Sequence, residues 1–124
     1  MVGYLKRRPS ATHKRYCKVL KIKDDKELIN AYREAHAPGK VWPEITAGMK
    51  EVGILDMELY LFDDIVFMIM DTVPGFDHDR AMKLLGSLPR QSEWETEMSK
   101  YQVAEGAEDK PEKWKIIERI FELE

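Results

Sequence analysis

A tyrosine and a histidine lie four residues apart in the segment AYREAH, as Tyr32 and His36. Residues at this spacing lie on the same face of an α-helix. Histidine gains or loses a proton near neutral pH, and a neighbouring tyrosine hydroxyl can orient it or relay a proton. The pair is therefore a candidate for general acid–base catalysis. A half-buried helix end with satisfied polar groups would show the same pattern, so spacing alone does not decide between the two.

Other common arrangements of catalytic residues are missing from the sequence. No G-x-G-x-x-G, P-loop or G-x-S-x-G segment is present, which argues against the usual nucleotide and serine-hydrolase sites. His78 has acidic neighbours in FDHDR, but Asp77 is better explained as the N-cap of a helix than as a metal ligand. Because no Cys/His pairing has metal-ligand spacing and no nucleotide-binding motif is present, we expect no metal and no cofactor.

The first half of the chain predicts a strand followed by two helices. The β-rich run YCKVLKI, residues 16–22, is the expected strand. Asp24 stands three residues before a glutamate, the spacing of a capping box, so a first helix should run from there to about His36. Pro43 suits the first turn of a second helix, and Gly53 suits its end.

The segment LDMELYLF, residues 55–62, alternates between apolar and other residues and predicts a half-buried strand. We expect one face of this strand to meet the helices, with Leu55, Met57, Leu59 and Leu61 on it. Tyr60 and Phe62 should lie on the opposite face. After a turn at Asp63-Asp64, IVFMIMDTV predicts a third strand that pairs with the second in a hairpin.

Two helical pieces, residues 77–85 and 89–101, and a last strand over residues 115–123 complete the predicted order. Merging the helix pairs gives β-α-β-β-α-β, the order of a ferredoxin-like α+β domain with an antiparallel sheet and helices on one face. The aromatic outer face favours a homodimer with the sheets face to face, a dimeric α+β barrel. We expect one domain over residues 15–124, after a basic N-terminal extension over residues 1–14.

Composition limits the classes of partner. The chain has 124 residues, 35% of them charged, and a net charge of −3, which favours neither nucleic acid nor membrane as a partner. Five basic residues and no acidic one fall within residues 1–15, where a solvated terminus is the expected structure. This segment lacks the apolar core of a signal peptide, and no apolar run reaches the roughly 18 residues that suggest a membrane span. The single Cys17 fits a reducing cytoplasm.

Several segments together resemble the L-rhamnose mutarotase family over about residues 15–123. The shared segments, in order, are AYREAH, VWPEI, LYLF, EWETEM and ERIFEL. The resemblance implies a ferredoxin-like domain that dimerises through its sheets and acts on a monosaccharide. It also implies that His36 is the proton donor and that Tyr32 contacts the sugar.

Three departures from the family pattern fall near the expected site. Gly39 and Lys40 look like a two-residue insertion, and Met57 stands where the family often has a sugar-contacting tyrosine. Glu95 follows Trp94 where the family often has a second tryptophan. We expect Trp94 to stack on the sugar and Glu95 to accept a hydrogen bond from a hydroxyl. Because the binding surface differs while the donor is kept, L-fucose is a candidate substrate beside L-rhamnose.

The expected function is therefore an aldose mutarotase that interconverts the α and β pyranose anomers of a 6-deoxyhexose. Two alternatives stay open, because a fold does not determine a function. The same dimeric architecture is found in oxygenases that act on aromatic substrates, whose pocket should be apolar throughout. A non-catalytic binding protein would keep the fold and lack the activity.

Overall fold

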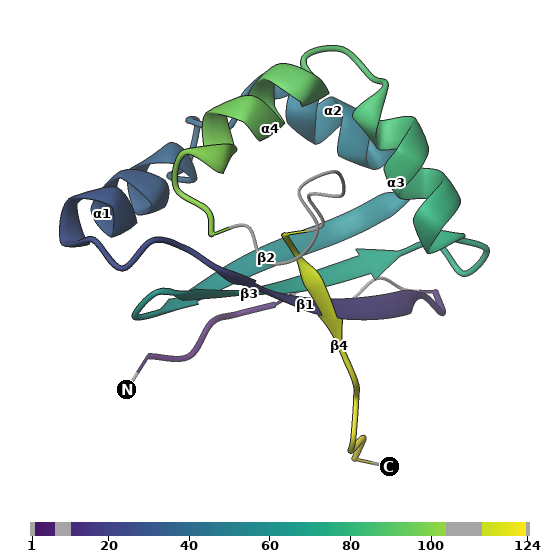
Figure 1. Cartoon of the computed structure of the whole chain (residues 1–124). Helices are drawn as coiled ribbons and strands as arrows, with labels where there is room; N and C mark the ends of the chain where they lie inside the picture. Colours follow the sequence, from purple (N-terminus) through teal and green to yellow (C-terminus); the bar gives the residue numbers. More distant parts are fainter. Residues whose placement is uncertain (1, 7–10, 104–112, 124) are drawn as a thin grey trace.

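The computed structural model describes residues 2–6, 11–103 and 113–123. Each predicted helix and strand has a counterpart in it (Figure 1). The elements are β1 (Lys14–Lys21), α1 (Lys26–Ala35), α2 (Pro43–Glu51), β2 (Ile54–Phe62), β3 (Ile65–Thr72), α3 (His78–Gly86), α4 (Gln91–Ser99) and β4 (Lys115–Ile117).

The four strands form one antiparallel sheet in the order β2-β3-β1-β4. All four helices cover the same face of this sheet, and both the N-terminal segment and the end of the chain lie toward its other face (Figure 1). In this order β3 of the β2–β3 hairpin lies beside β1 and β2 forms the edge of the sheet, as in a split β-α-β unit. The predicted ferredoxin-like α+β fold is confirmed.

Local signals in the sequence explain where the helices begin. Asp25 caps α1, with its carboxylate accepting from the backbone N–H groups of the two residues that follow Lys26. The prediction of Asp24 as the cap was wrong by one residue. Asp77 caps α3 as predicted, and Pro43 opens α2. Gly53 ends the turn after α2 with φ +103°, a conformation that disfavours any side chain.

The β2 strand departs from its predicted alternation at its first residues. Ile54 pairs with Thr72 and Asp56 pairs with Asp71, so Leu55 is an extra residue between them. This bulge turns Ile54 into the core, where it is 4% exposed, and leaves Leu55 48% exposed. The prediction that Leu55 shares the helix-facing side was therefore wrong.

The last strand is shorter than predicted. β4 ends at Ile117, and residues 118–123 continue without strand pairing in the single chain. Ile120, Phe121 and Leu123 are each at least 75% exposed. Apolar side chains on an extended segment match the β-rich sequence, but a single chain offers this segment no strand to pair with.

Two apolar clusters fill the space between sheet and helices. The first lies against α1 and α4 and contains Leu20, Tyr32, Val66, Trp94 and Tyr101 among others. The second lies against α2 and α3 and contains Ile54, Met68, Met70 and Phe76. Leu59 and Trp114 pack against both clusters.

The outer face of the sheet is partly covered by the N-terminal segment. Arg15 donates two hydrogen bonds to Asp71, at 2.8 and 3.0 Å, and lowers the pKa of that carboxyl group. Lys6 pairs with Asp56, and the ring of Tyr4 meets that of Tyr60 edge-on, with centroids 5.8 Å apart.

The structure describes only part of the predicted basic extension, residues 1–14. Residues 2–6 are exposed, and β1 already begins at Lys14. Arg7 and Arg8 lie outside the described residues. None of the helices in the described ranges is long and apolar enough to cross a membrane.

Candidate active site

His36 is fixed at the C-terminal end of α1 by the preceding turn of the helix. Its Nδ1 lies 2.8 Å from the backbone carbonyl oxygen of Tyr32, and its ring centroid is 4.5 Å from that of Tyr32. A carbonyl only accepts, so Nδ1 carries a hydrogen and the neutral ring keeps its lone pair on Nε2. Burial lowers the pKa of His36, although the bond to the carbonyl opposes this shift. The lowered pKa and the bond at Nδ1 therefore favour a neutral imidazole at neutral pH.

Tyr32 is a core residue as much as a site residue. It is 4% exposed, and its ring packs edge-on against Tyr101 with centroids 5.7 Å apart. Burial raises the pKa of the Tyr32 hydroxyl to about 12, while a hydrogen bond with the Gln102 side chain lowers it. The hydroxyl therefore stays protonated at neutral pH. The structure gives Tyr32 a direct role in orienting His36, through its carbonyl and its ring.

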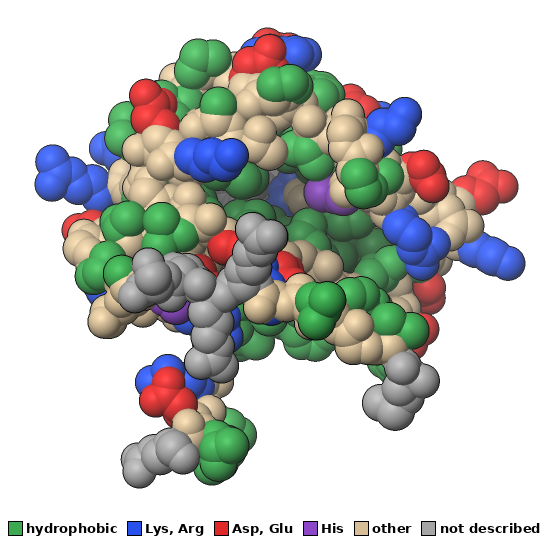
Figure 2. All heavy atoms as spheres, turned by 180° about the vertical axis from the view of Figure 1, so that it is seen from behind, with side chains coloured by type: hydrophobic (Ala, Val, Ile, Leu, Met, Phe, Trp, Pro, Cys, Tyr) green, Lys and Arg blue, Asp and Glu red, His purple; other side chains and the backbone are tan. Residues whose placement is uncertain are grey.

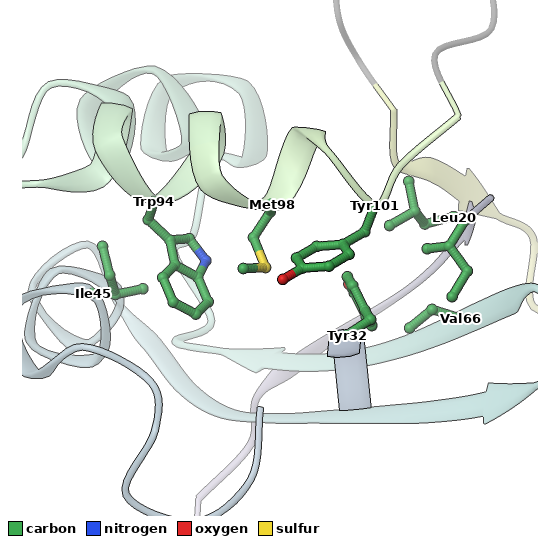
Figure 3. Packing of buried hydrophobic residues seen from close by; sticks show 8 residues of the cluster. Leu20, Tyr32, Ile45, Val66, Trp94, Met98 and Tyr101 are labelled. Carbon is green, nitrogen blue, oxygen red and sulfur yellow. The ribbon is translucent and has the colours of Figure 1, made fainter. Parts of the chain in front are cut away.

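Trp94 approaches the histidine from the opposite helix. Trp94, Met98 and Tyr101 are spaced along one face of α4 and the turn that follows, and all three point toward the sheet (Figure 3). The Trp94 ring meets His36 nearly at right angles, with centroids 5.8 Å apart. Because Trp94 is only 8% exposed, most of its ring surface is covered by the protein. Only a small part of the Trp94 ring is therefore exposed for the predicted stacking on a sugar.

A second tryptophan extends this aromatic group outward. Trp42 immediately precedes α2, is half-buried, and meets Trp94 edge-on with centroids 5.1 Å apart. The turn before it contains Gly39, one of the two inserted residues, Gly39 and Lys40. Gly39 has φ +81°, a left-handed conformation that glycine adopts most easily. The insertion therefore belongs to the turn that carries Trp42 back to Trp94.

Arg90 holds Trp42 from the other side, a contact that the sequence did not reveal. Its guanidinium carbon lies 4.1 Å from the centroid of the Trp42 ring, a cation–π contact, and its nitrogens lie within 3.7 Å of Glu44 and 3.5 Å of Glu93. Arg90 is the N-cap of α4 with φ +64°, an uncommon conformation for a residue with a side chain. Only the structure shows that this conformation aims the side chain at α2.

Glu95 and Met57 lie outside the ring contacts that join Tyr32, His36 and Trp94. Glu95 is exposed on α4, where its Oε1 accepts from Nε2 of Gln91 at 3.3 Å. Met57 lies on the helix-facing side of β2, opposite Met70, and packs against the second apolar cluster. Neither of them has a ring or hydrogen-bond contact with His36 among the described contacts.

The back of the molecule is hollowed between the helices and the sheet. Figure 2 shows that hydrophobic side chains line this hollow and that a histidine and a basic side chain lie inside it. Walls of mixed polarity are typical of sites that bind small organic molecules. A histidine in this setting can exchange protons with a bound hydroxyl group.

No metal-binding group was found in the ranges that the structure describes. Three or more His, Cys, Asp or Glu side chains do not come together there at metal distance. His78 instead stacks on Tyr16, with centroids 5.2 Å apart, and its Nδ1 lies 2.9 Å from a carboxylate oxygen of Asp79. Its neighbour Asp77 is occupied as a helix cap.

Comparison with known proteins shows the family to which the chain belongs. The family model described as L-rhamnose mutarotase matches residues 15–123. An L-fucose mutarotase from Xanthomonas campestris pv. campestris is 37% identical over 111 residues, which cover 88% of this chain and 87% of the relative. An L-rhamnose mutarotase from Flavobacterium johnsoniae is 30% identical, with 68% of this chain and 76% of the relative covered.

A solved structure has the same fold. The crystal structure of an L-rhamnose mutarotase from Formosa agariphila superposes with a TM-score of 0.65 over 90% of this chain and 99% of its own, at 17% identity. With the family model matching nearly the whole chain, the protein belongs to the L-rhamnose mutarotase family of carbohydrate isomerases.

Proposed function

We propose that this protein is a mutarotase that interconverts the α and β pyranose anomers of a 6-deoxyhexose, with L-fucose as the first substrate to test. The observation that carries the proposal is the hydrogen bond from Nδ1 of His36 to the carbonyl of Tyr32. It fixes the ring and its tautomer, and it leaves Nε2 as the nitrogen that exchanges a proton. A positioned, neutral imidazole is what anomer exchange needs.

The reaction follows from the two oxygens attached to the anomeric carbon. Nε2 of His36 accepts the proton of the anomeric hydroxyl, and the imidazolium then donates it to the ring oxygen as the bond between that oxygen and C1 breaks. C1 and its hydroxyl oxygen become an aldehyde, and rotation about the C1–C2 bond presents its other face. Ring closure reverses both proton transfers. His36 is thus the donor to the ring oxygen, after it has acted as a base.

The neighbours of His36 hold its ring in one orientation during these proton transfers. The carbonyl of Tyr32 stabilises the imidazolium as well as the neutral ring, because Nδ1–H is a donor in both forms. Tyr32 and Trp94 restrict the ring on two sides. Since the steps are proton transfers with the cleavage and re-formation of one C–O bond, and no oxidation state changes, the proposal requires neither a metal nor a redox cofactor. A rate increase on the order of 10²–10⁴-fold is the usual contribution of such a group.

The choice of sugar rests on the relatives and on the departures in sequence. The relative named L-fucose mutarotase is 37% identical over 88% of this chain, whereas that named L-rhamnose mutarotase is 30% identical over 68%. Met57 and Glu95 replace the aromatic residues of the family pattern, and we propose that both contact the sugar from the edges of the hollow. L-rhamnose stays the second candidate because the family model carries its name.

We also propose that the molecule works as a homodimer in the cytoplasm. Phe62, Ile65 and Phe67 are 69, 36 and 39% exposed on the outer face of the sheet. A second copy facing this surface would cover these side chains and could offer a partner to the extended residues 118–123. Cys17 is free, which agrees with a reducing compartment.

Saturation-transfer NMR tests the proposed activity directly. Saturating the α-anomer signal of L-fucose should lower the β-anomer signal when the protein is present, and the same experiment on L-rhamnose and the D-sugars ranks the substrates. An oxygenase would consume oxygen with an aromatic substrate and leave anomer exchange unchanged. A binding protein would shift the sugar resonances without accelerating exchange. Either result in place of exchange would refute the proposal.

A further inference from the structure

Arg90 combines an uncommon backbone conformation with a side chain that contacts the aromatic group of the candidate site. Its φ is +64°, and within the described residues Asp63 is the one other non-glycine residue with a positive φ. Aspartate tolerates this conformation better than most residues, and glycine adopts it without strain. Backbone strain persists where the surroundings hold it in place, and it is concentrated at functional sites. Because a glycine would suit the turn before α4 better, the side chain of Arg90 is a candidate for a role of its own.

The side chain of Arg90 joins the start of α4 to the start of α2. Its guanidinium carbon is 4.1 Å from the centroid of the Trp42 ring. Its nitrogens approach a carboxylate on each helix, that of Glu44 on α2 at 3.7 Å and that of Glu93 on α4 at 3.5 Å. A planar guanidinium group can lie on an aromatic ring and still reach carboxylates with its edge. Arg90 therefore restrains the Trp42 ring, in addition to the contact of that ring with Trp94.

Trp42 is connected to His36 by two routes. Its ring meets that of Trp94 edge-on, with centroids 5.1 Å apart, and the Trp94 ring meets that of His36 at 5.8 Å. The backbone provides the second route, because His36 is the C-cap of α1 and Trp42 is the N-cap of α2. The turn over residues 37–41 joins the two caps. A displacement of Trp42 can therefore displace the imidazole through the rings and through this turn.

We propose that Arg90 is a positioning residue of the mutarotase reaction, which acts through Trp42 to keep the His36 ring where it can exchange protons with the sugar. The inference deepens the proposed function and rests on it. Proton transfer needs a separation of hydrogen-bond length between the two atoms, so a small displacement of the imidazole lowers kcat. Binding of the sugar depends less on this single separation, so KM changes less. Arg90 itself does not need to touch the sugar.

Arg90→Gly separates positioning from stability. Glycine adopts the left-handed conformation without strain, and the side chains of Glu44 and Glu93, 41% and 65% exposed, can be hydrated in place of their ion pairs. We expect the thermal midpoint to stay the same or rise. The kcat of anomer exchange should fall about fivefold or more, and KM should change less than about twofold. An unchanged kcat in folded Arg90→Gly would overturn the proposal.

Asp63→Gly is the matched control, because it replaces the other positive-φ residue of the described chain. Asp63 lies at the turn between β2 and β3, and it has no contact with the rings of Trp42, Trp94 or His36 among the described contacts. Asp63→Gly should leave kcat unchanged, whatever its effect on the thermal midpoint. A fall in kcat equal to that of Arg90→Gly would show that kcat responds to the glycine substitution rather than to the lost guanidinium group, and would overturn the proposal.

A double-mutant cycle tests whether Arg90 acts through Trp42. In a Trp42→Leu background, Arg90→Gly should have little further effect on kcat, because the contact that it breaks is already lost. A fall of the same size in both backgrounds would overturn the route through Trp42.

Arg90→Lys provides the conservative variant. It keeps the positive charge but loses the planar group that bridges Trp42 and the carboxylates, so its kcat should lie between those of Arg90→Gly and the unmodified protein. It replaces Arg90→Gly in the test if that variant does not fold, and a kcat equal to that of the unmodified protein would then overturn the proposal.

NMR of the tryptophan side chains gives a readout that does not depend on turnover. The indole N–H resonances of Trp42 and Trp94 should shift in Arg90→Gly, whereas that of Trp114, just before β4, should not. Unshifted Trp42 and Trp94 resonances would overturn the role of Arg90 while the unmodified protein still exchanges anomers. Lack of exchange of L-fucose and L-rhamnose by the unmodified protein would instead overturn the mutarotase function itself, and with it this role.

Discussion

Tyr32 holds His36 through its backbone rather than through its hydroxyl. The carbonyl of Tyr32 accepts from Nδ1 of His36 at 2.8 Å, while the hydroxyl end is buried and forms a hydrogen bond with Gln102. The two residues therefore form one unit, and in the proposed mechanism Nε2 of His36 is the nitrogen that exchanges protons. Side-chain substitutions at the two positions should have very different effects.

Replacing His36 by alanine should remove the activity and spare the fold. His36 is the C-cap of α1 and only half-buried, so its loss leaves the core in place. We expect anomer exchange to fall by about 10²–10⁴-fold, the range for a lost general acid–base group. Saturation-transfer NMR measures the rate, and circular dichroism checks the fold. A folded variant that exchanges anomers at the original rate would make His36 structural.

Replacing Tyr32 by phenylalanine should cost stability more than activity. The carbonyl and the ring that contact His36 are kept, and only the buried hydroxyl with its hydrogen bond to Gln102 is lost. We expect the free energy of unfolding to fall by about 1 kcal/mol, as for one hydrogen bond, and exchange to fall less than about tenfold. Urea unfolding and NMR exchange rates give the two values. A loss as large as that of His36→Ala would show that the hydroxyl takes part in proton transfer.

The pH dependence of exchange should report the neutral form of His36. Burial lowers its pKa from the ordinary 6.5. The value of kcat/KM should therefore be constant above about pH 6.5 and fall only at lower pH, with its inflection below that of a free histidine. An inflection above pH 7 would contradict the assignment of His36 as a neutral base.

The free energy of unfolding should also depend on the protonation of His36. At pH above about 6.5 the imidazole is neutral in both the folded and the unfolded chain, so it adds no pH dependence. As the pH falls from there toward the folded pKa, the unfolded chain binds the proton more readily, and the contribution to stability is lost. His36→Ala should remove this part of the acid destabilisation.

A positive charge on the outer face of the sheet should dissociate the proposed dimer. Phe67 lies on β3, a strand with neighbours on both sides, and is 39% exposed on this face. Phe67→Lys would place two ammonium groups in an interface between facing sheets, so sedimentation velocity should show a monomer. Leu84→Lys, at an exposed apolar position on α3 (51% exposed), is the control and should stay dimeric. A folded Phe67→Lys dimer would move the interface elsewhere.

The fold could be predicted from the sequence because alternation and caps are local signals. The hairpin, the cap at Asp77, the start of α2 at Pro43 and the order of elements follow from neighbouring residues alone. The bulge at Leu55 could not be predicted, because it depends on how β2 pairs with β3. The end of β4 at Ile117 likewise depends on the available partner strand rather than on propensity.

The site could be predicted only where it is local. Tyr32 and His36 are one helical turn apart, so their contact follows from spacing. The contact of Arg90 with Trp42 joins the starts of α4 and α2 and depends on the left-handed backbone conformation of Arg90. No pattern in the neighbouring sequence predicts it.

The choice of sugar can be tested at Glu95. It follows Trp94 on α4, is exposed, and is held by Gln91. A carboxylate there accepts hydrogen bonds from sugar hydroxyls, whereas an indole would offer an apolar plane. We expect Glu95→Trp to shift the ratio of exchange rates from L-fucose toward L-rhamnose by about 1–2 kcal/mol, the size of one hydrogen bond. Ser92→Trp, at an exposed position of the same helix, is the control and should leave the ratio unchanged. If Glu95→Trp also leaves it unchanged, the carboxylate does not reach the sugar, and Met57 becomes the next position at which to test the choice of sugar.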